Sequence, residues 1–241
     1  MSRIYSLDYL RGIVACGIMI FHYTTWTFGE FDSNFFLGRL GLYGVSIFYI
    51  LSGLTLFLVY SQKMKIDLSG LKSFFVKRIF RIFPLMWLVT LTAIFLSGQW
   101  PDWFNLFLNL SGLFSVFKWD VAFSPGIWSI GNELVFYMLF PLVIFLFRLR
   151  NPIFLIVFCS VVFVVYCCFA FGLLQNDNPL NTQWKMYINP LNQFFLFLAG
   201  ILIGVANKHI KLNNLSAILL ILTSIGLFSF YPVVGDKIAL V

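Results

Sequence analysis

Two ionisable side chains, His22 and Glu133, stand well inside long apolar segments of the sequence. Ionisable groups are costly at membrane depth, so each of them is a candidate functional residue. The unperturbed pKa of histidine, near 6.5, suits a general base that takes a proton from a hydroxyl group. The alternatives are a packing histidine that bonds to a neighbouring backbone, and a glutamate that is a structural partner of Asn132 or Tyr137.

Three arginines add a second kind of chemistry. Arg11 precedes His22 by 11 residues, which at about 100° per residue places both on one helix face, about 16 Å apart. Arg78 and Arg81 are three residues apart and share a face of another helix. Because guanidinium forks suit phosphate, the trio predicts a ligand with phosphates at one end and a long arm, such as acyl-coenzyme A. The alternative for the pair is anchoring at the cytoplasmic membrane surface.

The composition indicates which elements must position these residues. The 241 residues are 61% hydrophobic and only 10% charged, whereas a soluble domain is about 25% charged. The chain therefore lacks the polar residues to cover a water-soluble fold. The same figures exclude a disordered chain, a collagen-like fibre and a soluble nucleic-acid-binding protein, so the sequence predicts a membrane protein with no nucleic-acid partner.

The apolar segments predict an all-α fold, a polytopic transmembrane helix bundle in a single membrane domain over residues 1–241. A spanning helix needs about 20 mostly apolar residues. About seven segments meet this need: 10–28, 42–60, 79–97, 127–147, 153–174, 190–206 and 215–232. Segment 103–117 is shorter and interrupted by polar residues, which favours an interfacial or re-entrant helix. The first segment is long, carries Arg11 and His22, and lacks a cleavage site, so a retained helix is expected rather than a signal peptide.

The basic residues predict the orientation of these spans. With the N-terminus in the cytoplasm, segments 1–11, 61–81, 148–152 and 207–214 are cytoplasmic and hold 12 of the 16 Lys and Arg residues. These are Arg3, Arg11, Lys63, Lys65, Lys72, Lys77, Arg78, Arg81, Arg148, Arg150, Lys208 and Lys211. An excess of Lys and Arg in short cytoplasmic loops sets the orientation of membrane helices. The same excess accounts for most of the net charge of +7.

This orientation places His22 and Glu133 at similar depths. His22 lies about 18 Å from the cytoplasmic end of its span, and Glu133 about 9 Å from the outer end of its own. In a hydrocarbon layer of about 30 Å, both fall in the outer half and could meet. The four cysteines (Cys16, Cys159, Cys167 and Cys168) lie in apolar runs without metal-ligand spacing. We therefore expect small buried side chains there, with neither a disulfide framework nor a metal site.

Four ordered motifs resemble the acyltransferase-3 family of multipass membrane O-acyltransferases. The first is LDYLRG at 7–12 with the Phe-His pair at 21–22, and the second is GVSIFYILSG at 44–53. The third is FVKRIFRIFP at 75–84. The fourth is WSIGNE at 128–133, followed by the Phe-Tyr pair at 136–137 and by Pro141. The likeness runs from the N-terminus to about residue 147, and its specificity comes from the order of the four motifs.

The resemblance implies a role for each candidate residue. His22 would be the essential catalytic histidine and Glu133 an acid of the catalytic pocket. Arg11, Arg78 and Arg81 would bind or position the donor, acyl-coenzyme A, which is a co-substrate and not a permanently bound cofactor. The acceptor would be a hydroxyl of a sugar or a lipid-linked glycan, with acetyl the commonest acyl group. The expected location is a bacterial inner membrane, in contact with its lipids.

The sequence also permits other interpretations of the chain. Family members have more spanning helices than are found here, so the resemblance implies a fragment, a truncated product, or a chain completed by a partner subunit or by further C-terminal helices. His22 and Glu133 could instead form the proton relay of a transporter or flippase, although the inverted repeats typical of such proteins are absent from the sequence. The third interpretation is a non-catalytic membrane subunit.

Overall fold

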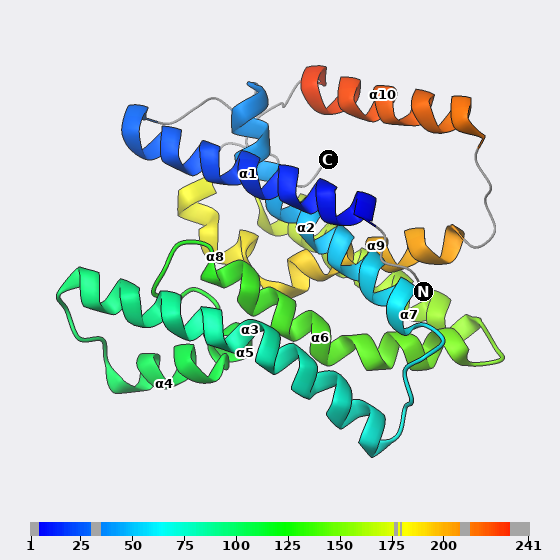
Figure 1. Ribbon diagram of the computed structural model, residues 1–241, viewed down its shortest axis with the longest axis horizontal. Coiled ribbons are helices and arrows are strands. Elements are labelled where there is room, and N and C mark those ends of the chain that lie inside the picture. The colour runs from blue at the N-terminus through cyan, green and yellow to red at the C-terminus, as the bar shows by residue number, and fades with distance from the viewer. Residues whose placement is uncertain (1–4, 30–34, 176–177, 179, 208–212, 232–241) are drawn as a thin grey trace. The chain divides into compact units, whose positions relative to one another are not determined.

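The computed structural model describes residues 5–29, 35–175, 178, 180–207 and 213–231, and these contain helices and no strand (Figure 1). The predicted cytoplasmic residues Arg3, Lys208 and Lys211 lie outside the described residues. The α-helices are α1 (Tyr5–Phe28), α2 (Phe36–Tyr60), α3 (Leu68–Ser97), α4 (Trp103–Ser111), α5 (Phe114–Phe117), α6 (Ile127–Arg148), α7 (Ile153–Cys167), α8 (Trp184–Tyr187), α9 (Pro190–Ala206) and α10 (Asn214–Phe230). A π-helical segment, η1 (Cys168–Leu173), extends α7, and a 3₁₀ segment, η2 (Leu180–Gln183), precedes α8.

Four of the described helices are long and apolar enough to cross a membrane: α2, α3, α6 and α7 with its extension. The pair Leu180–Tyr187 and Pro190–Ala206 is bent by 67° and makes a fifth if it is one span. The prediction of an all-helical, multi-pass membrane protein is therefore confirmed. α10 is a shorter apolar helix of 17 residues, and in α1 the apolar run is interrupted by Arg11 and His22. For these two helices, spanning stays a prediction.

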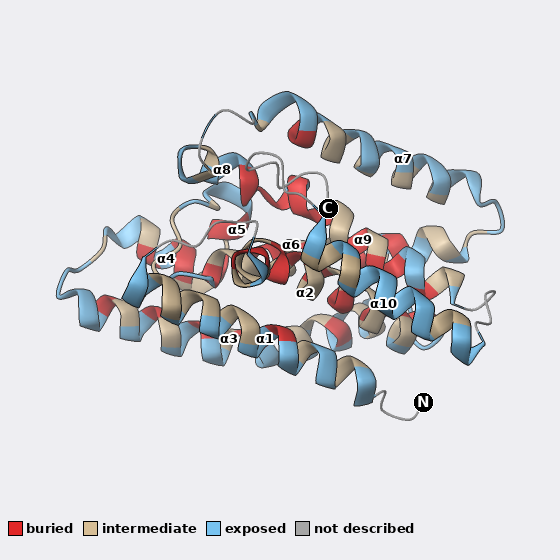
Figure 2. Cartoon of the chain, turned by 90° about the horizontal axis from the view of Figure 1, so that it is seen from above, coloured by how far each residue is buried: buried red, intermediate tan, exposed pale blue. Residues whose placement is uncertain are grey.

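Exposure along the helices fits a lipid environment. The described residues of α7 and α10 include no buried one, and buried residues (Phe169 and Ala170) begin only in the extension η1, the red turn at one end of α7 in Figure 2. Their exposed side chains are nevertheless large and apolar, including Val161 on α7 and Leu222 on α10. In water such continuous apolar surfaces would be costly, whereas in a bilayer the lipid chains cover them.

Segment 103–117 is not one helix but two short ones, α4 and α5. Asp102 caps α4 by accepting a hydrogen bond from the Asn105 N–H, and Gly112 ends it with a φ of +73°. Only glycine adopts this left-handed conformation without strain. Asn109, fully buried, donates to the carbonyl of Val121 and accepts from the N–H of Phe123, which holds the following loop. Neither helix is long enough to span, as predicted for this segment, while its interfacial or re-entrant placement stays a prediction.

The described chain divides into two compact units, which are considered separately. The first comprises 1–59, 170–180 and 196–241, and the second 60–169 and 181–195. In the second unit, α6 packs against α3, α5 and α7. Its buried face carries Phe136 and Phe140, and the ring of Phe140 stacks on Phe74 of α3 with centroids 5.5 Å apart. This aromatic core fixes α3 and α6, the two helices that carry Arg78 and Glu133.

In the first unit, glycines allow the helices to approach closely. A Cβ atom at Gly41 or Gly44 of α2 would overlap side chains of α1. A Cβ at Gly53 would lie 2.0 Å from the carbonyl oxygen of Phe197, and one at Gly200 would lie 2.0 Å from that of Ile50. α2 and α9 therefore cross with their backbones in contact, as small residues permit in membrane helices.

We expect Gly200→Ala to lower the free energy of unfolding by about 2 kcal/mol, because the added methyl group would force the two backbones apart. Gly226→Ala is a matched control, since nothing lies within 4 Å of a Cβ at this position of α10. There the substitution should be neutral or stabilising by up to about 1 kcal/mol, because alanine favours helix over glycine. Thermal unfolding of both variants in detergent measures the difference, and equal unfolding temperatures would contradict the close crossing.

Two arginines bond to the carbonyl groups at helix ends. Arg148, at the end of α6, donates through Nε to the Ser61 carbonyl (3.0 Å) and through Nη1 to that of Met64 (2.6 Å), just beyond the end of α2. Arg39 is 4% exposed and donates to the carbonyls of Phe228 and Tyr231 at the end of α10. These carbonyl groups lack helical partners and carry partial negative charge, so a guanidinium satisfies and stabilises them.

Candidate active site

Helix α1 carries Arg11 and His22 in the first unit. The helix is continuous over Tyr5–Phe28, so the predicted alignment of the two residues holds, with about 16 Å between them along the axis. Arg11 is partly buried and donates through Nη2 to the carbonyl of Leu51 on α2, at 2.9 Å. This hydrogen bond holds the N-terminal half of α1 against α2.

The imidazole of His22 lies among aromatic rings. It stacks on the indole of Trp26 with centroids 5.3 Å apart and an interplanar angle of 27°, and meets Phe21 edge to face at 5.2 Å. His22 is half-buried. Aromatic faces attract cations, so the indole would stabilise the imidazolium that forms when His22 accepts a proton. The surroundings are therefore compatible with a general base.

In the second unit, three rings surround the guanidinium of Arg78, and we call them the aromatic cage: Tyr60, Phe74 and Tyr137. Their centroids lie 5.3, 5.5 and 5.4 Å from the guanidinium carbon, respectively. Nη2 donates to the Tyr60 hydroxyl at 3.0 Å. The Nε atom is buried and has no hydrogen-bond partner among the described residues. The cage thus holds a cation without neutralising its charge.

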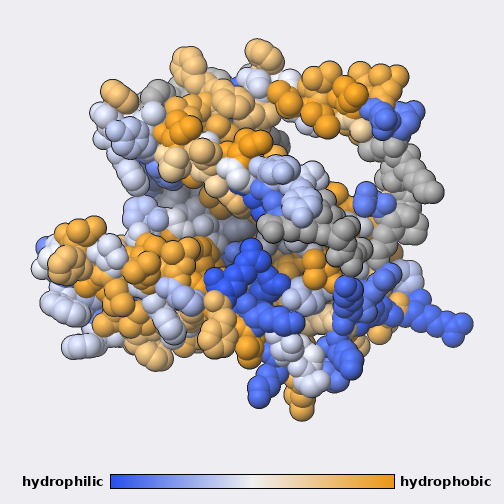
Figure 3. Space-filling model, in the orientation of Figure 1, coloured by the Kyte–Doolittle hydropathy of each residue, from blue (hydrophilic) through white to orange (hydrophobic). Residues whose placement is uncertain are grey.

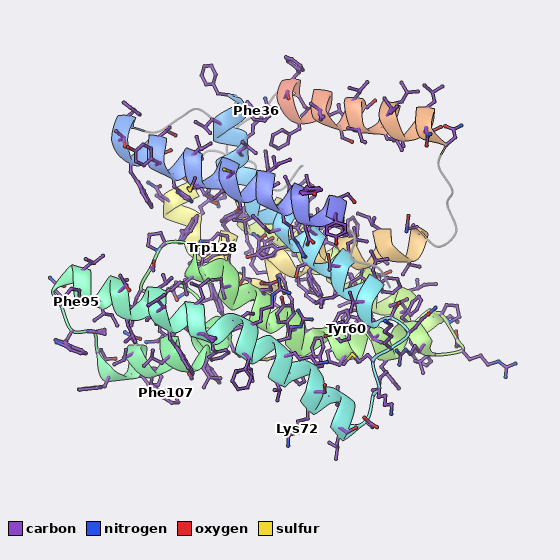
Figure 4. All side chains as sticks on the ribbon, in the orientation of Figure 1. Phe36, Tyr60, Lys72, Phe95, Phe107 and Trp128 are labelled. Carbon is purple, nitrogen blue, oxygen red and sulfur yellow. The ribbon has the colours of Figure 1, made fainter. Side chains whose placement is uncertain are left out.

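Glu133 is joined to this cage through Tyr137. The two residues are one turn apart on α6, and the Tyr137 hydroxyl donates a short hydrogen bond to Oε1 of Glu133. Tyr60 lies at the C-terminal end of α2, beside the side chains of α3 and α6 (Figure 4). Arg78 and Glu133, predicted from separate motifs, therefore belong to one cluster of side chains.

Arg81 occupies the next turn of α3 and its side chain is exposed. Hydrophilic residues gather over the first part of α3 and the loop that precedes it (Figure 3), including Lys63, Lys65, Lys72 and Lys77. Asp67 caps α3 within this basic segment, and hydrogen bonds from the Gly70 N–H and the Ser69 hydroxyl lower the pKa of its carboxyl group. The segment therefore provides a cationic surface next to Arg78.

The structure brings together some of the predicted residues. Arg11 and His22 share one helix, and Arg78 and Glu133 share one cluster, with Arg81 one turn away. The meeting of His22 with Glu133 joins residues of the two separate units and stays a prediction. Sequence analysis missed Tyr60 and Phe74. Tyr137, named from the sequence as an alternative partner of Glu133, does bond to it, at the i, i+4 spacing that favours such pairs. Tyr60 lies on another helix, and no local pattern indicates it.

Comparisons with known proteins agree with the four motifs. The family model described as an acyltransferase domain, that of the acyltransferase-3 family, matches residues 4–237. ORF330 of Acidianus two-tailed virus, named as a candidate acetyltransferase, is 30% identical over 186 residues, which cover 75% of this chain and 51% of the relative. The peptidoglycan O-acetyltransferase OatA of Listeria monocytogenes is 27% identical over 169 residues, which cover 61% of this chain and 25% of OatA.

The chain spans about half of the viral relative and a quarter of the bacterial one. No solved structure matches the chain. The family model, in contrast, extends over nearly the whole sequence and includes every candidate residue from Arg11 to Glu133. The chain belongs to the acyltransferase-3 family of membrane acyltransferases.

Proposed function

We propose that this protein is a membrane O-acyltransferase that moves an acyl group, most simply acetyl, from acyl-coenzyme A to a hydroxyl of a sugar or a lipid-linked glycan. The observation that carries the proposal is the state of Arg78. Its guanidinium is held by three rings and one neutral hydroxyl, its Nε is buried without a partner, and no carboxylate pairs with it among the described residues. A partly buried cation in this state favours an anionic ligand.

The phosphate groups of the donor would bind Arg78 and Arg81, and the same role for Arg11 stays a prediction from the sequence. An extended pantetheine arm would then carry the thioester toward His22. The separate roles of the arginines and of His22 follow from their chemistry, because a guanidinium binds phosphate through parallel hydrogen bonds and an imidazole exchanges protons near neutral pH. The orientation proposed from the charges, with the N-terminus in the cytoplasm of a bacterial inner membrane, places the arginines on the side where acyl-coenzyme A is made.

Two routes of transfer are compatible with this arrangement. In the direct route, His22 takes the proton of the acceptor hydroxyl, whose oxygen bonds to the thioester carbon while the carbon–sulfur bond breaks and the thiolate takes up a proton. In the covalent route, an imidazole nitrogen of His22 first displaces the thiolate, which takes up a proton. The acyl group then passes to the acceptor oxygen as the carbon–nitrogen bond breaks and the acceptor hydroxyl gives up its proton, so that the two protons balance. In both routes the role predicted for Glu133 from the sequence is to orient the imidazole or to stabilise its charged form.

A carbohydrate acceptor is supported by the comparison with the bacterial relative. The bacterial relative is named for acetylation of peptidoglycan, and its similarity supports an acceptor of this chemical class. The acceptor would enter from the side of the membrane opposite to the donor, near the start of α6. His22 and Glu133, both expected in the outer half of the membrane, would then meet the acceptor hydroxyl close to that surface.

The proposal is tested by incubating membranes that contain the full chain with acetyl-coenzyme A labelled in the acetyl group. Free thiol should appear in equal amount to label transferred, and membranes without the chain should release none. A transporter would leave the thioester intact, and a non-catalytic subunit would neither release thiol nor move the label. Either of these two outcomes rejects the proposed activity.

A further inference from the structure

The aromatic cage orients Arg78 without neutralising it. A guanidinium offers five N–H donors, and the cage accepts one of them, through the Tyr60 hydroxyl. The remaining contacts are with the faces of the three rings, which attract a cation but carry no net charge. The Tyr60 hydroxyl therefore fixes one edge of the Arg78 guanidinium, while the positive charge of the guanidinium stays available to a ligand.

Tyr137 contacts both Arg78 and Glu133. Its ring lies 5.4 Å from the guanidinium carbon of Arg78, and its hydroxyl donates to Oε1 of Glu133. The ring is also part of the buried core, since Tyr137 is 3% exposed and meets Phe74 edge to face. A displacement of the ring would therefore change the surroundings of the cation and of the carboxylate together.

We propose that Tyr60 and Tyr137 are positioning residues that couple donor binding at Arg78 to the carboxylate of Glu133. Tyr60 fixes the plane of the Arg78 guanidinium, which binds phosphate. Tyr137 links the position of that guanidinium to the position of the Glu133 carboxylate. The proposal rests on the function proposed above, in which Arg78 binds the phosphates of acyl-coenzyme A. It adds two residues to the site, and it assigns each of them a different kinetic effect.

Phenylalanine substitutions separate these effects from packing, because they keep both rings and remove only the hydroxyls. Tyr60→Phe removes the acceptor of the Arg78 Nη2 hydrogen bond, and should raise the KM for acetyl-coenzyme A about tenfold with kcat within about twofold of the wild type. Tyr137→Phe removes the donor to Glu133, and should lower kcat about tenfold while moving the acid limb of the pH profile.

Tyr43→Phe is the matched control. Tyr43 is a buried tyrosine of α2, 4% exposed, and its hydroxyl has no hydrogen-bond partner among the described residues. Loss of this hydroxyl should leave KM, kcat and the pH profile unchanged. The control shows whether removal of a buried tyrosine hydroxyl by itself alters the enzyme.

The experiment measures kcat, KM for acetyl-coenzyme A and the pH profile for the wild type, the three single variants and Tyr60→Phe/Tyr137→Phe, all as full chains in membranes. Coupling predicts that the double variant loses less in kcat/KM than the product of the two single losses. The inference is overturned if both cage variants match Tyr43→Phe, or if the two single losses in kcat/KM simply multiply in the double variant. A wild type without acetyl-coenzyme A-dependent thiol release would overturn the proposed function itself, and this inference with it.

Discussion

Replacing His22 with alanine is expected to lower acetyl transfer at least about 100-fold, because a positioned general base contributes about 10² to 10⁴ in rate. The loss of fold stability should be small, since the half-buried imidazole contacts only rings of its own helix in the contacts described above. Alanine is also the best helix former, so α1 is retained. The rate of thiol release from acetyl-coenzyme A and the thermal unfolding of the same preparation measure the two effects separately.

His209→Ala is the matched control for this prediction. It makes the same substitution at the second of the two histidines in the chain, and transfer should continue at the wild-type rate. Rapid acid quenching of the wild type with labelled donor then distinguishes the two routes, because only the covalent route leaves label on His22. Transfer by His22→Ala at the rate of the control would remove His22 from the chemistry.

The membrane helices could be predicted because a long apolar segment has few alternatives in a bilayer, where the backbone must satisfy its own hydrogen bonds. Helix breaks were harder to predict. The polar interruptions of segment 103–117 could be seen in the sequence, but its division into α4 and α5 depends on the left-handed conformation of Gly112. The bend between α8 and α9 likewise follows from local backbone geometry, to which hydropathy is insensitive.

In the candidate site, residues could be predicted where the signal lies in neighbouring positions of the sequence, but not where it depends on contacts between helices. The i, i+3 spacing predicted Arg78 and Arg81, the position of an ionisable group inside an apolar segment predicted Glu133, and Tyr137 was one of the two partners considered for Glu133. Tyr60 could not be found in this way, since it is one of 10 tyrosines in a chain with 31 phenylalanines and lies 18 residues from Arg78. Arg148 illustrates a further limit, because charge counting predicts the side of the membrane on which it lies but not its bonds to the carbonyls after α2.

Replacing Arg78 with alanine is expected to raise the KM for acetyl-coenzyme A about 10-fold to 100-fold, since hydrogen bonds between charged groups contribute about 1.5–3 kcal/mol. The substitution removes the charge and empties the aromatic cage. Arg78→Lys keeps the charge but loses the planar fork, so an intermediate KM is expected. Initial rates at varied acetyl-coenzyme A concentrations, with membranes containing the full chain, measure these values.

Lys77→Ala makes the same charge change at the adjacent residue of α3, whose side chain is exposed. If Arg78 acted only by adding to the positive surface of the segment, the two alanine variants would raise KM alike, and the effect would vanish at high salt. A specific site in the cage predicts a large effect for Arg78→Ala at high salt as well, because partly buried charges are less screened. The salt dependence of the two variants therefore separates binding in the cage from attraction by the cationic surface around it.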